Sequence, residues 1–333
     1  MRKSAARLGF FLVFTAVALA SVGVPAAEPY TEERESGPRR HLLRRASQAT
    51  PQEQLAYADG LKARGQFKKA DRQYRWLVRS WPNAPEAAVA QLNHAVHLRK
   101  RKKFEKSFEA LQHLVETYPG RFPFDEVLSM QFGIAKDLME RRRGQFLFFP
   151  GFRSPQQALP LLEKVVKNGP RWEHAAEAQY LMGQIREENR EEEMAVLDYM
   201  DTMLRYPRSP YATKAALGRA RGLVHLSNRS PYDRELAQEA WYALTMYRTS
   251  YLGSQDPGEV DEMTRTVYNR LARGAYDIAL FYDLKAKRPK SALVAYESFV
   301  RSYPVSEWTE EANARIEDLS KVVNREEHAQ FAQ

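Results

Sequence analysis

The sequence contains no cysteine. This absence excludes disulfide bonds, thiolate nucleophiles, cysteine-bound zinc and a lipid anchor on a cysteine behind a leader peptide. A glycine-rich phosphate-binding loop is also missing, and only seven histidines are present. Because these groups supply much of catalytic and metal-binding chemistry, we expect no enzymatic activity, no metal site and no cofactor.

Long apolar runs are missing after residue 26, where no segment approaches the roughly twenty apolar residues of a membrane-spanning helix. The first 26 residues differ from the rest. Arg2, Lys3 and Arg7 precede an apolar run over 10–24, and small residues follow up to Ala26. This order is typical of a secretory signal peptide, which we predict over residues 1–26. Together with the absence of cysteine, the signal favours a bacterial envelope, and we expect the mature chain in the periplasm.

Acidic residues are fewer than basic ones, with 42 Asp and Glu against 51 Lys and Arg and a net charge of +9. The basic residues are spread along the chain rather than gathered beside stacking aromatic residues. Nucleic acid is therefore not the expected partner. In an envelope, the natural anionic partners are other proteins and lipid head groups.

A repeated pattern organises the rest of the chain. A small residue stands twelve positions before a proline, and an aromatic residue stands eight positions before it. The three instances are Ala70, Tyr74 and Pro82; Ala195, Tyr199 and Pro207; and Ala292, Tyr296 and Pro304. An interval of 37 residues also separates Pro82 from Pro119 and Pro170 from Pro207. The pattern predicts an all-α, tetratricopeptide-type right-handed α-solenoid of about five to six helical hairpins over residues 51–320.

The flanking segments and the irregular units are predicted from composition. Residues 27–50 are expected to form a flexible tether and residues 321–333 a polar tail. In the third unit we expect a long first helix over 125–143 and a second helix capped by Ser154. Further expectations are an inter-helix loop at 227–231, a linker at 252–260, and a final unit over 261–319 that begins with an extended helix.

The first helix of each unit is expected to line the concave side of the solenoid. Candidate residues for a peptide-binding groove there are Asp59, Lys62, Leu92, Arg99, Lys100, Tyr180 and Gln184, with Glu187 beside them. A basic early part and an acidic middle part would hold an extended peptide by charge as well as by side-chain pockets. Ordinary solvation of the inner helices explains the same residues equally well.

Phe146, Phe148, Phe149 and Phe152 form an unusually apolar loop in the third unit. One interpretation is that the loop folds back and completes the core. The other is that it docks on a partner protein or enters the membrane interface, where the flanking Arg141–Arg143 and Arg153 suit anionic head groups.

Two polar clusters resemble chemical sites but have simpler explanations. His94 and His97 stand three apart on one predicted helix, yet no further ligand completes a zinc site. The run 187–193 holds five carboxylates, and we expect it to be a solvated turn between helices rather than a catalytic pair.

The repeat closings at 206–209 and 303–306, together with the predicted signal, resemble the outer-membrane protein assembly factor BamD family. The segment from Arg270 to Tyr282 is similar to the late helix of that family. The resemblance implies a non-catalytic periplasmic scaffold that binds the β-barrel insertase and unfolded outer-membrane proteins at the inner face of the outer membrane. The chain departs from the family in one respect, since members normally carry a lipidated cysteine after the signal.

By the same resemblance, the late repeats would contact the insertase through Arg270, Arg273, Tyr276 and Lys285. The alternative function is a generic periplasmic repeat adaptor that coordinates cell-wall synthesis or division. Lytic transglycosylases also place a helical solenoid before a catalytic domain, but we expect no such domain after the last repeat.

Overall fold

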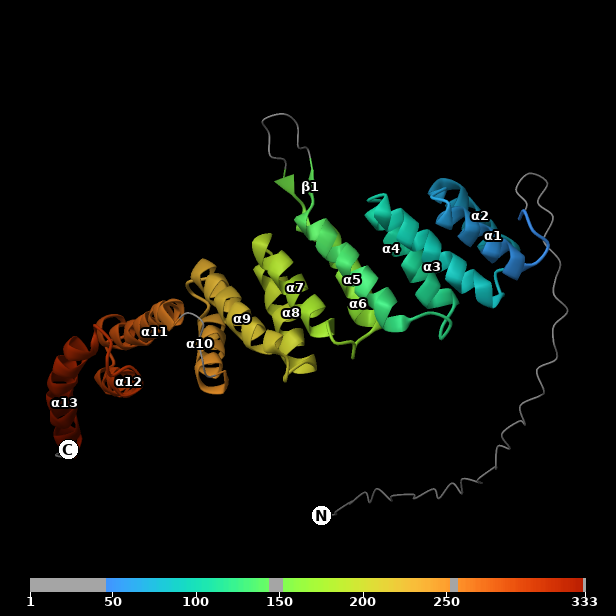
Figure 1. Ribbon diagram of the computed structural model, residues 1–333. Helices are drawn as coiled ribbons and strands as arrows, with labels where there is room; N and C mark the ends of the chain where they lie inside the picture. Colours follow the sequence, from blue (N-terminus) through green and yellow to red (C-terminus); the bar gives the residue numbers. More distant parts are fainter. Residues whose placement is uncertain (1–45, 144–151, 252–256, 332–333) are drawn as a thin grey trace, which may run out of the picture.

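The computed structural model describes residues 46–143, 152–251 and 257–331 (Figure 1). Within these residues, thirteen α-helices form six successive pairs and a closing helix. They are α1 (Pro51–Ala63), α2 (Phe67–Ser80), α3 (Pro85–Lys100), α4 (Phe104–Thr117), α5 (Phe124–Glu140), α6 (Leu159–Asn168), α7 (Ala175–Glu188), α8 (Glu192–Arg205), α9 (Pro210–Arg229), α10 (Arg234–Ser250), α11 (Pro257–Leu280), α12 (Pro289–Ser302) and α13 (Thr309–Phe331). The short elements are strands β1 (Arg142–Arg143) and β2 (Phe152–Arg153), the 3₁₀-helix η1 (Pro155–Ala158) and the π-helix η2 (Phe281–Lys285).

The helix pairs stack in chain order, from α1 at one end of the molecule to α13 at the other (Figure 1). Each helix packs against the helix before it and the helix after it in the chain. Neighbour-to-neighbour packing of this kind is the defining property of a repeat array. The chain is therefore an all-α solenoid of tetratricopeptide type, and the predicted number of hairpins is confirmed.

Local sequence signals set the helix starts. Proline occupies the first turn of α1, α3 and α9, where its missing N–H costs nothing. The Thr50 side chain accepts a hydrogen bond from Glu53 N, and the Asp233 side chain accepts one from Leu236 N. Such caps satisfy backbone donors that a helix otherwise leaves without a partner.

The turns inside three of the pairs share one geometry. Gly65, Lys102 and Arg190 all have positive φ, of 72°, 55° and 61°, directly after a first helix. In each case the following residue donates its N–H to the carbonyl five positions back, as in Lys103 N to Leu98 O at 3.0 Å. This is the Schellman ending of a helix, which favours glycine because a side chain strains the left-handed conformation.

The repeat aromatic residues lie in the core. Tyr74, Tyr199 and Tyr296 are almost fully buried, and each hydroxyl donates a hydrogen bond to a carboxylate of the preceding helix or turn. The acceptors are Asp59 at 2.6 Å, Glu187 at 2.5 Å and Asp283 at 3.3 Å. Burial, together with the neighbouring Asp283, raises the pKa of Tyr296 to about 12. The tyrosines thus fill the core while their polar ends are satisfied.

Buried amides form a second recurring feature. Gln54 Nε2 donates to Gln73 Oε1 at 2.8 Å, and Gln91 Nε2 donates to the Ala110 carbonyl at 2.8 Å. Gln131 Nε2 donates to Gln112 Oε1 at 3.0 Å. The paired residues are 19 positions apart in every case and join one helix to a neighbouring helix. These bonds place polar groups inside the solenoid without leaving them unsatisfied.

The apolar core is divided along the array. One cluster extends from α1 to α7, a second joins α8 to the first half of α11, and a third joins the second half of α11 to α12 and α13. The 24-residue α11 therefore belongs to two clusters at once. Its length confirms the prediction of an extended first helix in the last unit.

Several predicted boundaries require correction. Helix α5 ends at Glu140 rather than Arg143, because the chain then enters β1, which pairs antiparallel with β2. The second helix of that unit begins with η1, and the Ser154 side chain makes no capping bond. Helix α9 continues to Arg229, so only residues 230–233 separate it from α10.

The ends of the described chain also differ from the prediction. The last residues of the expected tether contact the first pair, where Ser47 N and Gln48 N donate to Gln54 Oε1 at 2.8 and 3.0 Å. At the other end, α13 continues through most of the expected tail to Phe331. Over the residues that the structure describes, no helix combines the length and the apolar character that crossing a bilayer requires.

Candidate functional site

The odd-numbered helices α1 to α11 form one continuous face of the solenoid, which we call the inner face. Three pairs of successive odd helices approach one another directly: α1 and α3, α7 and α9, and α9 and α11. In the part of the chain that the structure describes, no two successive even-numbered helices from α2 to α12 approach to a similar extent. Since the inside of a curved array has less room than the outside, the odd helices line the concave side, as predicted.

Polar side chains bridge each odd helix to the next. Lys62 Nζ donates to Asn93 Oδ1 at 2.7 Å, linking α1 to α3. Arg99 pairs with Asp137 at 3.2 Å and Lys136 pairs with Glu177 at 2.9 Å, which continues the series to α7. The bridges make the inner face a connected surface rather than a set of separate helices.

Arg221 continues this series into the late repeats. Its Nε lies 2.7 Å from Glu259 Oε1 on α11, and its NH1 lies 2.9 Å from Glu187 Oε1 on α7. The hydrogen bond to Glu259 is the main reason that the pKa of Arg221 lies above its ordinary value. Three successive inner helices are therefore joined by one guanidinium group.

The predicted early groove residues have mixed surroundings. Asp59 accepts the hydroxyl of Tyr74, and Lys62 and Arg99 form the bridges just described. Leu92 is half-buried and packs on the first core cluster. Lys100 is exposed at the end of α3. The predicted basic character of this part is thus reduced, because two of its three cations already have polar partners.

Aromatic residues lie at the middle of the inner face. Tyr180 is half-buried, with its ring 5.6 Å from the ring of Tyr199 and 5.6 Å from that of Tyr211. Lys214 Nζ lies 5.2 Å from the centre of the Tyr211 ring. Burial raises the pKa of Tyr180. We call Tyr180, Tyr211, Lys136 and Lys214 the central patch; the predicted Gln184 is half-buried one turn along α7.

The predicted late surface is only partly available. Tyr276 is 3% exposed and packs against the rings of Phe299 and Trp308, so its assignment to a partner surface is wrong. Arg270 donates to the Ser227 carbonyl and, at 2.7 Å, to Asn228 Oδ1, and thereby fastens α11 to the end of α9. The tyrosine is core because it meets three aromatic neighbours that are distant in sequence, namely Phe299, Trp308 and Tyr296, whose ring lies 5.9 Å away.

Two predicted late residues remain on the surface. Arg273 is exposed, lies 5.2 Å from the centre of the Trp308 ring and pairs with Asp277 at 2.9 Å. Lys285 is exposed in η2. Both side chains are placed where a partner could reach them.

An exposed apolar strip lies beside these cations and was missed by the sequence reasoning. Ile278, Phe281 and Leu284 are 43%, 53% and 62% exposed and follow one another along the end of α11 and η2. Their spacing of three residues is the available signal, since it places side chains on one side of a helix. We call these three residues the late strip.

Most of the predicted phenylalanine loop lies outside the part of the chain that the structure describes. Phe146, Phe148 and Phe149 lie outside the described residues. Of Phe152 only the backbone is described, and it pairs with Arg143 in the short hairpin. Both interpretations of this loop therefore stay predictions.

The two polar clusters noted in the sequence, the pair His94 and His97 and the run 187–193, make contacts with neighbouring helices. His94 Nδ1 lies 2.5 Å from Asp71 Oδ1, whereas the His97 ring lies 6.5 Å from that of Phe67, so the two imidazoles have separate environments. Within the described ranges no group of three or more metal-ligating side chains is gathered. The run 187–193 does lie at the turn between α7 and α8, as predicted. It is not wholly solvated, because Glu192 is buried and pairs with Arg229 at 3.1 Å.

Comparisons with known proteins concern the fold alone. No protein-family model matches the sequence, and no curated protein matches it either. Among solved structures, a tetratricopeptide repeat protein from Parabacteroides merdae is 12% identical, with 81% of this chain and 98% of that chain covered and a TM-score of 0.29. The C-terminal part of a repeat protein from Cytophaga hutchinsonii is 14% identical, with 79% and 87% covered and a TM-score of 0.31. The Pseudomonas aeruginosa protein pilF is 14% identical, with 79% and 96% covered and a TM-score of 0.27.

Proposed function

We propose that the chain is a non-catalytic scaffold that holds an extended segment of a partner protein along its inner face. The observation that carries this proposal is the central patch, where half-buried tyrosines lie beside lysines on the inner face. Aromatic side chains supply large contact areas at low entropic cost, and lysines add charge complementarity. A curved face built from successive helices offers the length that an extended segment needs.

The test places a photo-crosslinking amino acid at Tyr211 in the central patch. The control places it at Tyr242, which is 77% exposed on α10, outside the inner face. Crosslinks to partner segments at Tyr211 and none at Tyr242 support the inner face as the binding surface. Equal capture at both positions, or none at either, contradicts it.

The specific partner system follows from the resemblance to the BamD family. We propose that the chain acts in the periplasm, after export by the signal expected at residues 1–26, in assembly of outer-membrane β-barrel proteins. Its inner face would receive unfolded outer-membrane proteins, and the late strip with Arg273 and Lys285 would contact the insertase. Exposed apolar side chains rimmed by cations suit a protein interface better than solvent.

Two charged substitutions in the late strip test the insertase contact. Phe281→Glu with Leu284→Glu should weaken binding to the purified insertase at least tenfold, since both side chains are exposed and apolar. Tyr242→Glu is the control and should bind normally. Undiminished binding by the double variant would contradict this assignment.

The second candidate function is a periplasmic adaptor for cell-wall synthesis or division. Depletion of the protein separates the two. Loss of β-barrel proteins from the outer membrane supports the assembly role, whereas altered septation with normal β-barrel levels supports the adaptor role.

A further inference from the structure

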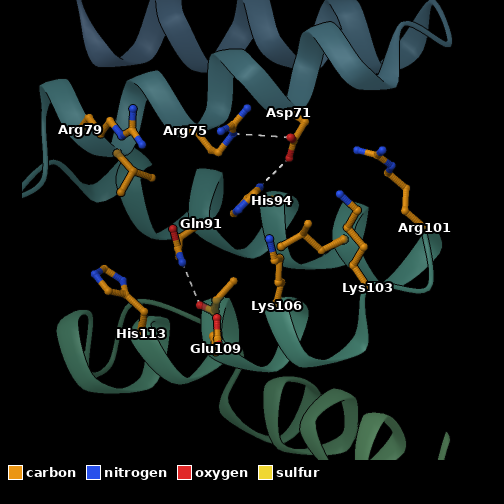
Figure 2. A pocket seen from close by; sticks show the side chains of 13 residues that line it. Asp71, Arg75, Arg79, Gln91, His94, Arg101, Lys103, Lys106, Glu109 and His113 are labelled. Atoms are coloured by element: carbon orange, nitrogen blue, oxygen red, sulfur yellow. Dashed lines mark hydrogen bonds and ion pairs between the residues drawn. The ribbon is translucent and has the colours of Figure 1, made fainter. Parts of the chain in front are cut away.

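A cavity of about 570 Å³ lies on the outer side of the first two helix pairs. It opens between α2 and α4, with α3 behind it (Figure 2). Helices α2 and α4 are more widely spaced than α1 and α3, which leaves room for it. The cavity is therefore separate from the inner face and from the late strip.

Cations surround this cavity. Its lining includes Arg75 and Arg79 from α2, and Arg101, Lys103 and Lys106 from the α3–α4 turn and the start of α4. Figure 2 shows Arg75 and Arg79 on one helix and Lys106 on the helix opposite, with Arg101 and His113 toward different ends of the cavity. Cations on two sides of one hollow focus a positive potential within it.

The acidic residues of the cavity neutralise little of this charge. Asp71 is buried and already engaged, since it lies 3.5 Å from Arg75 Nε and 2.5 Å from His94 Nδ1. Glu109 is the other carboxylate. Over the described residues, the side chains of Arg79, Arg101, Lys103 and Lys106 form no ion pair or hydrogen bond. These four charges are available to a ligand.

The lining also includes apolar side chains, beside the polar Gln91 and His94 of α3. Val78 from α2, Leu98 from α3 and Ala110 from α4 contribute to the lining, and Leu98 and Ala110 are each only 7% exposed. A ligand that places an apolar side chain here would remove it from water while its charged groups meet the surrounding cations. The lining therefore suits a ligand that is both acidic and partly apolar.

We propose that this cavity binds an acidic peptide segment of a partner protein, with carboxylates separated by apolar side chains. The cations are distributed along two helices rather than converging on one point, which matches separated carboxylates better than one compact phosphate. The site is additional to the proposed inner-face function and does not depend on it.

The probe is a fluorescently labelled peptide in which aspartate and glutamate alternate with leucine, with binding followed by anisotropy on the full chain. Lys103→Glu with Lys106→Glu should lower its affinity about tenfold or more, because two attractions become repulsions. An acidic residue at Lys106 lies in the first turn of α4, where it favours the helix, so folding should be retained. Circular dichroism checks this.

The matched control is Lys164→Glu with Lys167→Glu, two exposed lysines on the outer helix α6. This variant has the same net charge and should retain affinity within about twofold. A peptide with asparagine and glutamine in place of the acids should not bind, and one with serine in place of leucine should bind more weakly. Lys103→Arg with Lys106→Arg should preserve binding.

Three results would overturn the proposal. Equal losses in the two lysine-pair variants would mean that binding is general electrostatic attraction. Insensitivity to leucine replacement would mean that the apolar lining is not used. Binding of inorganic phosphate, or of vesicles containing phosphatidylglycerol, that depends on Lys103 and Lys106 while the peptide does not bind would assign the cavity to phosphate groups. Because the probe addresses only the outer cavity, none of these results bears on the inner-face crosslinks.

Discussion

At the scale of single residues, buried positions accommodate neither a larger side chain nor a charged one without loss of stability. Ala292 is fully buried within the third core cluster, where α12 packs against α11 and α13. The surrounding helices leave no space at this position for a side chain longer than a methyl group. The small residue twelve positions before the closing proline is thus a packing requirement.

We expect Ala292→Arg to lower the free energy of unfolding by roughly 3 kcal/mol or more, because a charged side chain would be forced into this contact. Thermal unfolding followed by circular dichroism measures the effect. Val294→Arg on the same helix is the control, since Val294 is 65% exposed, and it should change stability little. Similar melting of the two variants would contradict the assigned register.

Asp198 is a second residue whose surroundings decide its behaviour. Burial raises its pKa to about 6, although Arg186 lies 3.1 Å away and acts in the opposite direction. The folded chain therefore binds a proton at Asp198 over a pH range in which the unfolded chain has lost it. Stability from this residue falls as pH rises from about 4 to about 6 and stays low above that range.

We predict that Asp198→Asn raises the free energy of unfolding at about pH 8 by roughly 1–3 kcal/mol relative to the parent, and that this gain disappears near pH 4. Denaturant unfolding across this pH range tests it. Asp201→Asn serves as the control, because Asp201 is more exposed and pairs with Arg205 on the surface. A gain of equal size at both pH values would show that titration of Asp198 is not the cause.

At the scale of elements, the turn between paired helices stores avoidable strain. Arg190 adopts a φ of 61° at the end of α7, in the position that Gly65 occupies in the first pair. A side chain in this region destabilises the folded state by about 1–2 kcal/mol. Glycine removes this strain, but its greater freedom in the unfolded chain offsets part of the gain.

Replacing Arg190 by glycine should therefore stabilise the protein, by about 0.5–1 kcal/mol, and raise the melting temperature. Glu188→Gly is the matched control, since Glu188 is the last residue of α7 and has an ordinary helical backbone. It should destabilise by about 1 kcal/mol. If both glycine variants lose stability, the left-handed turn is not strained in solution.

At the scale of the whole molecule, stability is built from neighbouring units rather than from one central core. Arg221 connects α7, α9 and α11, and the cores of early and late repeats are separate clusters. In a linear array of this kind, a local defect affects its neighbours and leaves distant repeats intact.

Arg221→Met should accordingly increase amide hydrogen exchange in α7, α9 and α11, with α1 to α4 unchanged. The expected change in protection is about tenfold, since two charge-assisted bonds are removed. Arg248→Met is the control, because the pair of Arg248 with Asp261 is longer, at 3.7 Å, and exposed. Uniform loss of protection along the chain would contradict the division into separate clusters.

The sequence alone determined the repeat register and hence the fold. Small and aromatic residues recur at intervals set by the helix and by the length of one pair, so their spacing predicts which side chains meet inside a pair. The same reasoning placed Asp59, Lys62 and Arg99 on the inner helices. It could not show that Lys62 and Arg99 are already bonded, because their partners Asn93 and Asp137 belong to the next inner helix.

The tertiary structure decided what lies between units. The family resemblance assigned Tyr276 to a partner surface, but Trp308, which stands just before the closing helix α13, packs against its ring. The outer cavity combines residues of α2, α3 and α4, which no periodic pattern groups together. The physical reason is that helical periodicity governs contacts within a pair, whereas contacts between pairs depend on how each pair is rotated against the next.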